Sequence, residues 1–240
     1  MLEEKPTVGG GHPGHANYKR TLVNGLAWQV RDDPDYDVND PRLGLVHRID
    51  KDTAGLLVVA KTPDAKTELG KQFFAKTTKR EYICVTWGVP APASGRIETN
   101  IGRNPKDRLQ MATFPLDDPS SKYAATNYEV IEPLGHVAVV RCRLETGRTH
   151  QIRVHMKHIG HPLFNDARYG GDQILRGNRS AAYNRFIANS FAACPRQALH
   201  ARTLGFRHPR TGEEMFFTAE IPADMAALIE RWRKYMDGLK

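Results

Sequence analysis

The sequence predicts an α+β fold built around a largely antiparallel sheet, and three observations support this prediction. Runs rich in β-branched residues at 81–87, 125–131 and 137–144 have the length and composition of strands. The segments 64–76 and 223–236 carry apolar residues at helical spacing. No repeat, linker or low-complexity tract divides the 240 residues, so we expect one domain over 1–240.

The elements before residue 64 follow from local patterns. Residues 1–20, rich in Gly, His and Pro, are expected to be irregular, and the next ten, 21–30, have helical spacing with Thr21 as N-cap. An acidic loop over 31–41 follows. Short apolar runs on either side of a polar turn predict two strands, at 43–46 and 56–60.

The elements after residue 100 are less regular in pattern. A long loop is predicted over 101–116, whereas 148–158 fits either a strand or a helix. Residues 170–196, rich in Asn, Arg and Ala, show no clear pattern. Near the end of the chain, Pro209–Gly212 predicts a turn between two strands.

Composition limits the classes of protein. The net charge of +8 suits a polyanionic partner, because Lys and Arg that neutralise phosphates release counterions. No apolar run reaches the roughly 18–20 residues that span a membrane, and the first residues lack a secretory signal, so a cytoplasmic location is expected. The three cysteines are far apart, which argues against a disulfide framework; Cys84 and Cys142 are expected to be buried in strands.

The first segment whose residues could take part in catalysis is 44–61, GLVHRIDKDTAGLLVVAK. A strand runs into a polar turn that contains Asp50, followed by a second strand. Arg48 and Lys51 place Asp50 in a positive field, which favours an ionised carboxylate. The alternative is that Asp50 and Asp52 only cap the turn and pair with neighbouring bases, and this segment by itself fits both interpretations.

The second segment is 144–155, LETGRTHQIRVH. Gly147 permits a close approach of the backbone to a partner, and Arg148 and Arg153 can hold a phosphate or a carboxylate. Four histidines raise the question of a metal site, but their spacing matches neither H-E-x-x-H nor a Cys/His finger, so no metal is expected. They are His150, His155, His158 and His161.

Two further features have weaker signals. Tyr82 stands near the start of a predicted strand, where a tyrosine usually packs. The loop over 101–116 carries Arg103, Lys106 and Arg108, which fit either a solvated charged loop or an RNA-contacting finger.

Together these segments resemble the RluA-type family of RNA pseudouridine synthases, closest to its large-ribosomal-subunit (RluD-like) branch. The family pattern H-R-[LI]-D-x-x-T-S-G-[LIV] appears as HRIDKDTAGL at 47–56, and the tyrosine-bearing strand as REYICVTWG. The motif TGRTHQIRVH is complete at 146–155, and the downstream HPL and DxxYG elements match in order. Lys5-Pro6 and His12-Pro13 keep the spacing of the family's first stretch, so the resemblance covers nearly the whole chain.

The resemblance implies a fold, an activity and roles. The fold is the pseudouridine synthase catalytic fold, a mixed, largely antiparallel sheet flanked by helices and loops with a central RNA-binding cleft. Asp50 matches the catalytic Asp, Arg153 the basic residue that pairs with it, and Tyr82 the aromatic residue that packs on the target base. Pocket-lining positions are His47, Arg48, Thr53 and Ile152. RNA-contacting candidates are Arg103, Lys106, Arg108, Arg148, His150 and Gln151.

The implied reaction isomerises a uridine in RNA, with ribosomal RNA favoured over transfer RNA and with neither cofactor nor metal. A monomer is expected, because no coiled coil or swapped edge is visible. Departures from the family pattern are Ala54 for Ser, Val8 for Gly and Asn165 for Gly. The N-terminal S4 RNA-binding domain of many relatives is expected to be absent, and the start fits either a truncated or a naturally short member. Two alternatives remain: a non-catalytic RNA-binding module on the same fold, and a metal-dependent hydrolase built on the histidines.

Overall fold

The computed structural model describes residues 2–4, 22–29, 31–32 and 43–239, and the chain divides into two compact units. Unit 1 comprises residues 1–80 and 201–220, and unit 2 comprises 81–200 and 221–240. The chain passes from unit 1 into unit 2 within β3 (Lys79–Trp87) and returns within β8 (Leu199–Arg207). The single catalytic domain expected from sequence stays a prediction.

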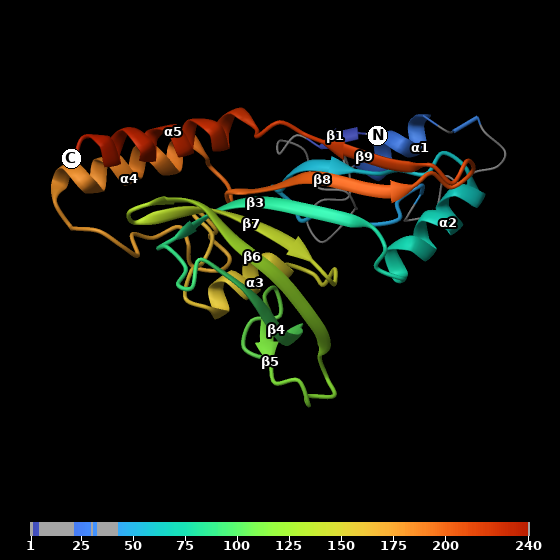
Figure 1. The fold of residues 1–240 in the computed structure, drawn as a ribbon, viewed down its shortest axis with the longest axis horizontal. Helices are drawn as coiled ribbons and strands as arrows, with labels where there is room; N and C mark the ends of the chain where they lie inside the picture. The colour runs from blue at the N-terminus through green and yellow to red at the C-terminus, as the bar shows by residue number, and fades with distance from the viewer. Residues whose placement is uncertain (1, 5–21, 30, 33–42, 240) are drawn as a thin grey trace. The chain divides into compact units, whose positions relative to one another are not determined.

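Unit 1 contains an antiparallel sheet and two helices (Figure 1). Leu2 pairs with Leu57 across the first two strands, and Thr203 with Thr218 across the last two. The strands β1, β2 and β8 lie in this order, and β9 pairs with β8. Apart from β8, the elements are β1 (Leu2–Glu4), α1 (Leu22–Gln29), β2 (Ala54–Leu57), α2 (Pro63–Phe74) and β9 (Glu214–Thr218).

Helix α2 shows how local sequence forms an element of unit 1. The Thr62 hydroxyl accepts the Ala65 N–H at 3.2 Å, and Pro63 stands at the first helical position, where its missing N–H costs nothing. Leu69 is buried in a cluster with Leu56 and Leu204. The helix therefore begins at a side-chain cap and is held by the apolar face it turns to the sheet.

Unit 2 contains the longer sheet, whose strands lie in the order β3, β7, β6, β4, β5. All its neighbouring strands are antiparallel. Its other elements are β4 (Ser94–Arg103), β5 (Met111–Phe114), β6 (Lys122–Leu134), β7 (Val137–Leu144), α3 (Gln151–His158), α4 (Ala181–Ala193) and α5 (Ala223–Asp237).

The core of unit 2 lies where α4 and α5 run side by side (Figure 1). Trp87 and Trp232 are fully buried there, with ring centroids 6.4 Å apart, and Phe164 packs on Trp87 at 4.9 Å. Cys84 and Cys142 are buried and free, as predicted. Helices α4 and α5 thus cover the part of the sheet that carries Trp87, whereas a second apolar cluster, with Ile101 and Ala124, packs against Val154 of α3.

Several predicted elements are confirmed. The helices over 64–76 and 223–236, the strands over 81–87, 125–131 and 137–144, and the closing strand pair are all observed within a few residues. The described part of the first predicted helix is α1, whereas Thr21 lies outside the described residues. So do Lys5, Pro6, Val8, His12, Pro13 and most of the acidic loop.

Two regions are predicted wrongly, and two regions without a firm prediction are decided by the structure. Residues 43–46 form only an isolated bridge, Leu45 with Val59, and the following strand is shifted to β2. The predicted loop over 101–116 contains β5 and the end of β4, because β4 pairs with both β5 and β6. The ambiguous 148–158 segment is helical from residue 151, and α4 lies in the segment without a pattern. Among the described residues no helix is long and apolar enough to cross a membrane.

Candidate active site

Asp50 lies on a turn of unit 1 that the backbone holds closed. The Ala60 N–H donates to Gly44 O at 2.8 Å, and the Thr53 N–H donates to Asp50 O at 3.0 Å. Asp52 has a left-handed backbone (φ 64°), a conformation that Asp tolerates better than most residues. Asp50 itself is half-buried. The turn therefore presents this carboxylate from a fixed backbone.

His47 continues the hydrogen bonding of that turn with its side chain. Leu45 pairs with Val59, so a regular ladder would next bring the Val58 N–H to a backbone carbonyl. Instead Val58 N–H donates to His47 Nε2 at 3.0 Å. With Nε2 as acceptor, the neutral ring carries its proton on Nδ1. The imidazole thus ends the ladder and lets the chain leave it before Asp50.

The surroundings of His47 keep the ring neutral. Its plane stacks on Phe73, with ring centroids 4.4 Å apart and an angle of 13°. Burial lowers the pKa of His47 to about 3, with a smaller contribution from the nearby Arg80 guanidinium. A proton on Nε2 would remove the acceptor that Val58 uses, so the neutral form and the turn geometry support each other.

The other predicted pocket residues of unit 1 occupy different environments. Thr53 is buried behind the turn, whereas Arg48 is exposed. Gly55 follows with φ 119°, and a Cβ there would collide with the backbone of Ala201. Only glycine fits this close approach, which explains its place in the sequence motif.

Unit 2 holds the aromatic and basic candidates. Tyr82 is buried in β3, opposite Cys142 of β7. Ile152 and Arg153 are both buried in the first turn of α3. The helix starts from His150, whose left-handed backbone (φ 56°) turns the chain sharply before Gln151. The candidates therefore come from one strand and one helix end.

Arg153 is anchored by a residue to which the sequence prediction gave no role. Its Nε and Nη2 donate to the two carboxylate oxygens of Asp166 at 2.7 and 2.8 Å. The Asp166 side chain is fully buried. The guanidinium also lies 5.0 Å from the ring centroid of Tyr169. At least two of its five N–H donors are thus used within unit 2, and the pairing of Arg153 with Asp50 stays a prediction.

Asp166 and Tyr169 together form the support of Arg153. Tyr169 OH lies 2.7 Å from His150 Nδ1 and accepts the Met111 N–H at 3.0 Å, so it ties α3 to β5. Both residues belong to the DARYG stretch, the downstream DxxYG element. The spacing of this element could have indicated the support of Arg153 from the sequence, because an aspartate and a tyrosine three residues apart can contact the same helix end.

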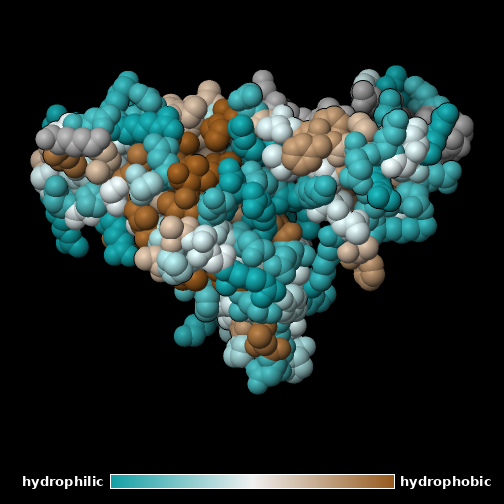
Figure 2. Space-filling model, in the orientation of Figure 1, coloured by the Kyte–Doolittle hydropathy of each residue, from teal (hydrophilic) through white to brown (hydrophobic). Residues whose placement is uncertain are grey.

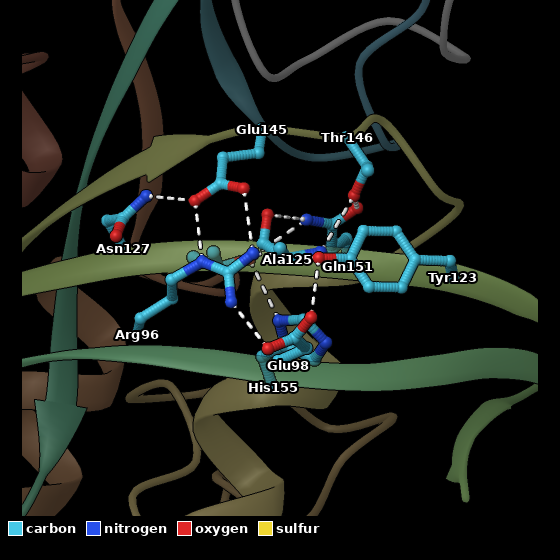
Figure 3. Close-up of polar contacts among 10 residues, drawn as sticks. Arg96, Glu98, Tyr123, Ala125, Asn127, Glu145, Thr146, Gln151 and His155 are labelled. Atoms are coloured by element: carbon cyan, nitrogen blue, oxygen red, sulfur yellow. Dashed lines mark hydrogen bonds and ion pairs between the residues drawn. The ribbon is translucent and has the colours of Figure 1, made fainter. Parts of the chain in front are cut away.

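A buried polar network fixes the start of α3 (Figure 3). Gln151 Oε1 accepts from Thr146 Oγ1 at 2.7 Å and from Arg148 N–H at 2.9 Å. Its Nε2 donates to Ala125 O and Thr126 Oγ1, both at 2.9 Å. All four hydrogen bonds of the amide are therefore made inside unit 2, and Gln151 positions the helix that carries Arg153.

His155 extends this network by one further helical turn. Its two ring nitrogens lie 2.8 Å from Thr126 Oγ1 and 3.1 Å from Thr99 Oγ1. Burial lowers the pKa of His155 to about 4, with a smaller contribution from His158.

The other three histidines considered as metal ligands have separate partners. His150 contacts Tyr169, His158 lies 3.0 Å from Thr113 Oγ1, and His161 lies 2.9 Å from Trp87 O. The described residues contain no group of three or more His, Cys, Asp or Glu placed to hold a metal ion.

The predicted RNA-contacting residues are divided between the hairpin of β4 and β5 and the start of α3. Arg103, Lys106 and Arg108 are exposed on the hairpin, where Arg103 Nη1 donates to Arg108 O at 3.0 Å. Arg148 Nε donates to Tyr123 O at 2.8 Å. The hairpin thus presents cations to solvent, and the RNA contacts of these residues stay predictions.

A groove on the face of the unit 2 sheet opposite Tyr82 is lined by paired charges. It encloses about 670 Å³ and is lined by Arg96, Arg141 and Arg143 among others. Carboxylates pair with each of these arginines; Arg96, for example, bonds to Glu145 at 2.8 Å (Figure 3). Side chains alternate along β3, so this charge-balanced face is opposite Tyr82. Its balanced charge does not suit a polyanion.

The fold and these side chains first define a class: an α+β enzyme fold with a carboxylate on a fixed turn and a basic hairpin suited to a polyanion. The model of the RNA pseudouridylate synthase family matches residues 14–158, and the chain belongs to this family. The sequence prediction of the family is therefore confirmed.

Individual relatives agree with this membership. An uncharacterized RNA pseudouridine synthase of Chlorobaculum parvum is 43% identical, over 94% of this chain and 69% of its own length. Ribosomal large subunit pseudouridine synthase D of Vibrio parahaemolyticus is 42% identical, over 93% of this chain and 65% of its own. The chain thus spans about two thirds of the length of these relatives.

The solved structure of human RNA pseudouridylate synthase domain containing 4 superposes with a TM-score of 0.68 at 23% identity. It covers 94% of this chain and 88% of the human chain. This likeness confirms the predicted α+β pseudouridine synthase fold. The central RNA-binding cleft stays a prediction.

Proposed function

We propose that this protein isomerises specific uridines of large-subunit ribosomal RNA to pseudouridine, with Asp50 as the catalytic carboxylate. Family membership together with the backbone-fixed turn at Asp50 is the observation that carries the proposal. The name of the Vibrio parahaemolyticus relative favours ribosomal RNA over transfer RNA. We place the enzyme in the cytoplasm as a monomer.

The chemistry explains why a carboxylate is needed. In pseudouridine formation the N1–C1′ glycosidic bond breaks, the uracil turns, and C5 bonds to C1′. The C5 proton leaves and N1 gains one, so the atoms balance without a redox partner. Asp50 either attacks C1′ as a nucleophile or removes the C2′ proton as a base. Both routes place the same carboxylate beside the sugar.

Tyr82 and Arg153 are proposed to complete the site. Because the reacting atoms are buried in stacked RNA, the uridine has to leave the stack, and an aromatic face can receive its base. Tyr82 supplies that face. Arg153 would hold the Asp50 carboxylate ionised and oriented, while Asp166 holds Arg153. The pocket would also retain the detached uracil until it rejoins the sugar.

The deciding experiment maps pseudouridines by carbodiimide labelling and primer extension, in RNA from cells with and without the gene. We expect one or a few sites of large-subunit ribosomal RNA to disappear, to return with the wild-type gene, and to stay absent with Asp50→Asn. Loss of pseudouridine sites in transfer RNA would instead identify transfer RNA as the substrate. Unchanged ribosomal and transfer RNA would favour the non-catalytic RNA-binding alternative.

A further inference from the structure

The C-terminal end of α2 carries an unusually exposed aromatic ring. Phe74 is 90% exposed, more than any other large apolar side chain of the described residues. Apolar side chains project from a hydrophilic surface at the end of α2 (Figure 2). The preceding residue, Phe73, is half-buried and stacks on His47. Two adjacent phenylalanines thus have opposite environments, and only the first is explained by packing.

Basic side chains outnumber acidic ones around Phe74, where Glu68 pairs with Lys71 and Glu214 lies near Lys79. Residues 69–80 contain four basic side chains and no acidic one. Lys71, Lys76 and Lys79 are all exposed, and Lys71 also pairs with Glu68. An exposed ring between cations is the arrangement by which proteins bind single-stranded nucleic acid, with bases stacked on the ring and phosphates on the cations.

The backbone at Lys76 is a second, independent observation. Lys76 N–H donates to Phe73 O at 3.3 Å and Thr77 N–H to Gln72 O at 3.1 Å, which is the hydrogen-bond pattern of a Schellman motif. Lys76 occupies the left-handed position of this motif (φ 60°), where glycine is usual and a side chain costs stability. A strained residue of this kind points to a use for its side chain.

The end of α2 is also held rigidly. The Gln72 amide donates to Arg207 O at 2.9 Å and accepts the Arg207 N–H at 2.8 Å, so the last turn is bonded to the end of β8. A binding surface held by secondary structure loses little conformational entropy when it receives a ligand. Phe74 is therefore displayed in a defined place.

We infer that Phe74, Lys71, Lys76 and Lys79 form an accessory RNA contact, the α2 platform, which is separate from the residues proposed to carry out the reaction. One unpaired base of the substrate stacks on Phe74, and the neighbouring phosphates pair with the lysines. This inference rests on the proposed function and adds to it that the substrate has a single-stranded element beside the target region.

The first test measures RNA affinity and turnover separately. The probe is in vitro transcribed large-subunit ribosomal RNA, with Kd from filter binding and the single-turnover rate at saturating protein. Phe74→Ala should raise Kd about tenfold, the size of one base–aromatic stack, and leave the saturated rate unchanged. Phe74→Trp should bind like wild type. Leu239→Ala, at an apolar side chain of unit 2 that is 61% exposed, is the matched control and should change neither value.

The second test uses the strain at Lys76. Lys76→Gly should raise Tm, because glycine relieves the left-handed backbone, and should weaken RNA binding. The slope of log K against log salt should fall by about 0.7, the value for one phosphate contact on a single strand. Lys234→Asn, at an exposed lysine in the last turn of α5, should keep the wild-type slope. If Lys76 served only the helix end, Lys76→Gly would leave RNA affinity unchanged.

The outcomes separate this inference from the proposed function. A wild-type protein that neither binds nor modifies RNA would overturn both. An active wild type with an equally tight Phe74→Ala variant would overturn the α2 platform alone. A Phe74→Ala variant that changes the sedimentation of the protein but not its RNA affinity would assign the ring to a protein partner, and would also overturn it.

Discussion

The turn of Asp50 in unit 1 and the start of α3 in unit 2 hold their functional side chains by different means. Asp50 stands on a turn closed by backbone hydrogen bonds and by one neutral imidazole. Arg153 is held by side chains instead. The buried Asp166 carboxylate binds its guanidinium, and the Gln151 amide, which makes four hydrogen bonds, fixes the start of the helix. In the described part of each unit a histidine has a pKa lowered by burial: His47 in unit 1 and His155 in unit 2.

Because of this difference, substitutions in the two regions should affect the reaction rate and the stability of the fold to different extents. A backbone-held turn tolerates a change of the reactive side chain, because the hydrogen bonds that shape it remain. A buried ion pair does not, because removal of one partner leaves the other charge buried without compensation. We therefore expect substitutions at the Asp50 turn to affect rate, and substitutions around Arg153 to affect folding as well.

Asp50→Asn should give the largest effect. An amide can neither attack C1′ nor accept a proton, so the rate of pseudouridine formation should fall by about 10⁴-fold. Tritium release from RNA labelled at uracil C5 measures this rate, since C5 loses its hydrogen. Asp52→Asn on the same turn is the control and should stay active with an unchanged Tm. A rate for Asp50→Asn within tenfold of wild type would remove Asp50 from the reaction.

Asp166→Ala should cause the largest loss of stability. It leaves the Arg153 guanidinium buried without its carboxylate, which costs about 3–5 kcal/mol of the free energy of unfolding. Arg153→Ala should cost a similar amount and also lower activity. Urea unfolding of both variants and of the double variant measures the coupling. Additive losses would show that the ion pair does not hold α3.

Tyr82→Ala should lower the rate about 10–100-fold, the size of one base–aromatic stack, with a smaller change in RNA affinity. Tyr82→Phe keeps the aromatic face and should retain most of the rate. Single-turnover rates and filter binding separate the two effects. A loss of affinity alone would contradict the proposed role of Tyr82 under the target base.

Gln151→Leu should destabilise the protein by about 1–3 kcal/mol, because it removes the acceptor of the Thr146 hydroxyl and of the Arg148 N–H. Gln173→Leu, at an exposed glutamine of the same unit, should change stability by less than about 0.5 kcal/mol. Urea unfolding measures both. Equal small losses would show that the hydrogen bonds of the Gln151 amide do not hold the start of α3.

The two histidines should make stability depend on pH in the same direction. The pKa of His155 is about 4 in the folded state and about 6.5 when unfolded, so the unfolded state binds more protons between these values. Stability should therefore fall as pH falls from 6.5 towards 4, by about 1–2 kcal/mol for His155 between pH 6.5 and 5. His47, with a pKa of about 3, acts in the same direction.

Comparing urea unfolding at pH 7 and pH 5 checks this expectation. His155→Gln and His47→Gln should each reduce the difference seen in the wild type. Glu132 also has a lowered pKa, through Arg233, but its effect is confined to pH values below the usual glutamate range. An unchanged pH dependence in both variants would show that neither histidine is held neutral.

The sequence by itself determined the family and most of the regular elements. Segments whose pattern is strong and local, such as α2 with its Thr62 cap and Pro63, or β3 with its β-branched run, were predictable because neighbours in sequence decide them. The motif around Asp50 was equally readable, since its residues are contiguous.

The tertiary structure alone decided what depends on distant residues. The segment after Gly147 is a helix because Gln151 bonds to Ala125 and Thr126, about 25 residues away in the chain. Likewise Asp166 is the partner of Arg153 because a loop returns it to the helix 13 residues later. Local periodicity carries no information about such contacts, and the free energy of these buried hydrogen bonds outweighs weak local preference.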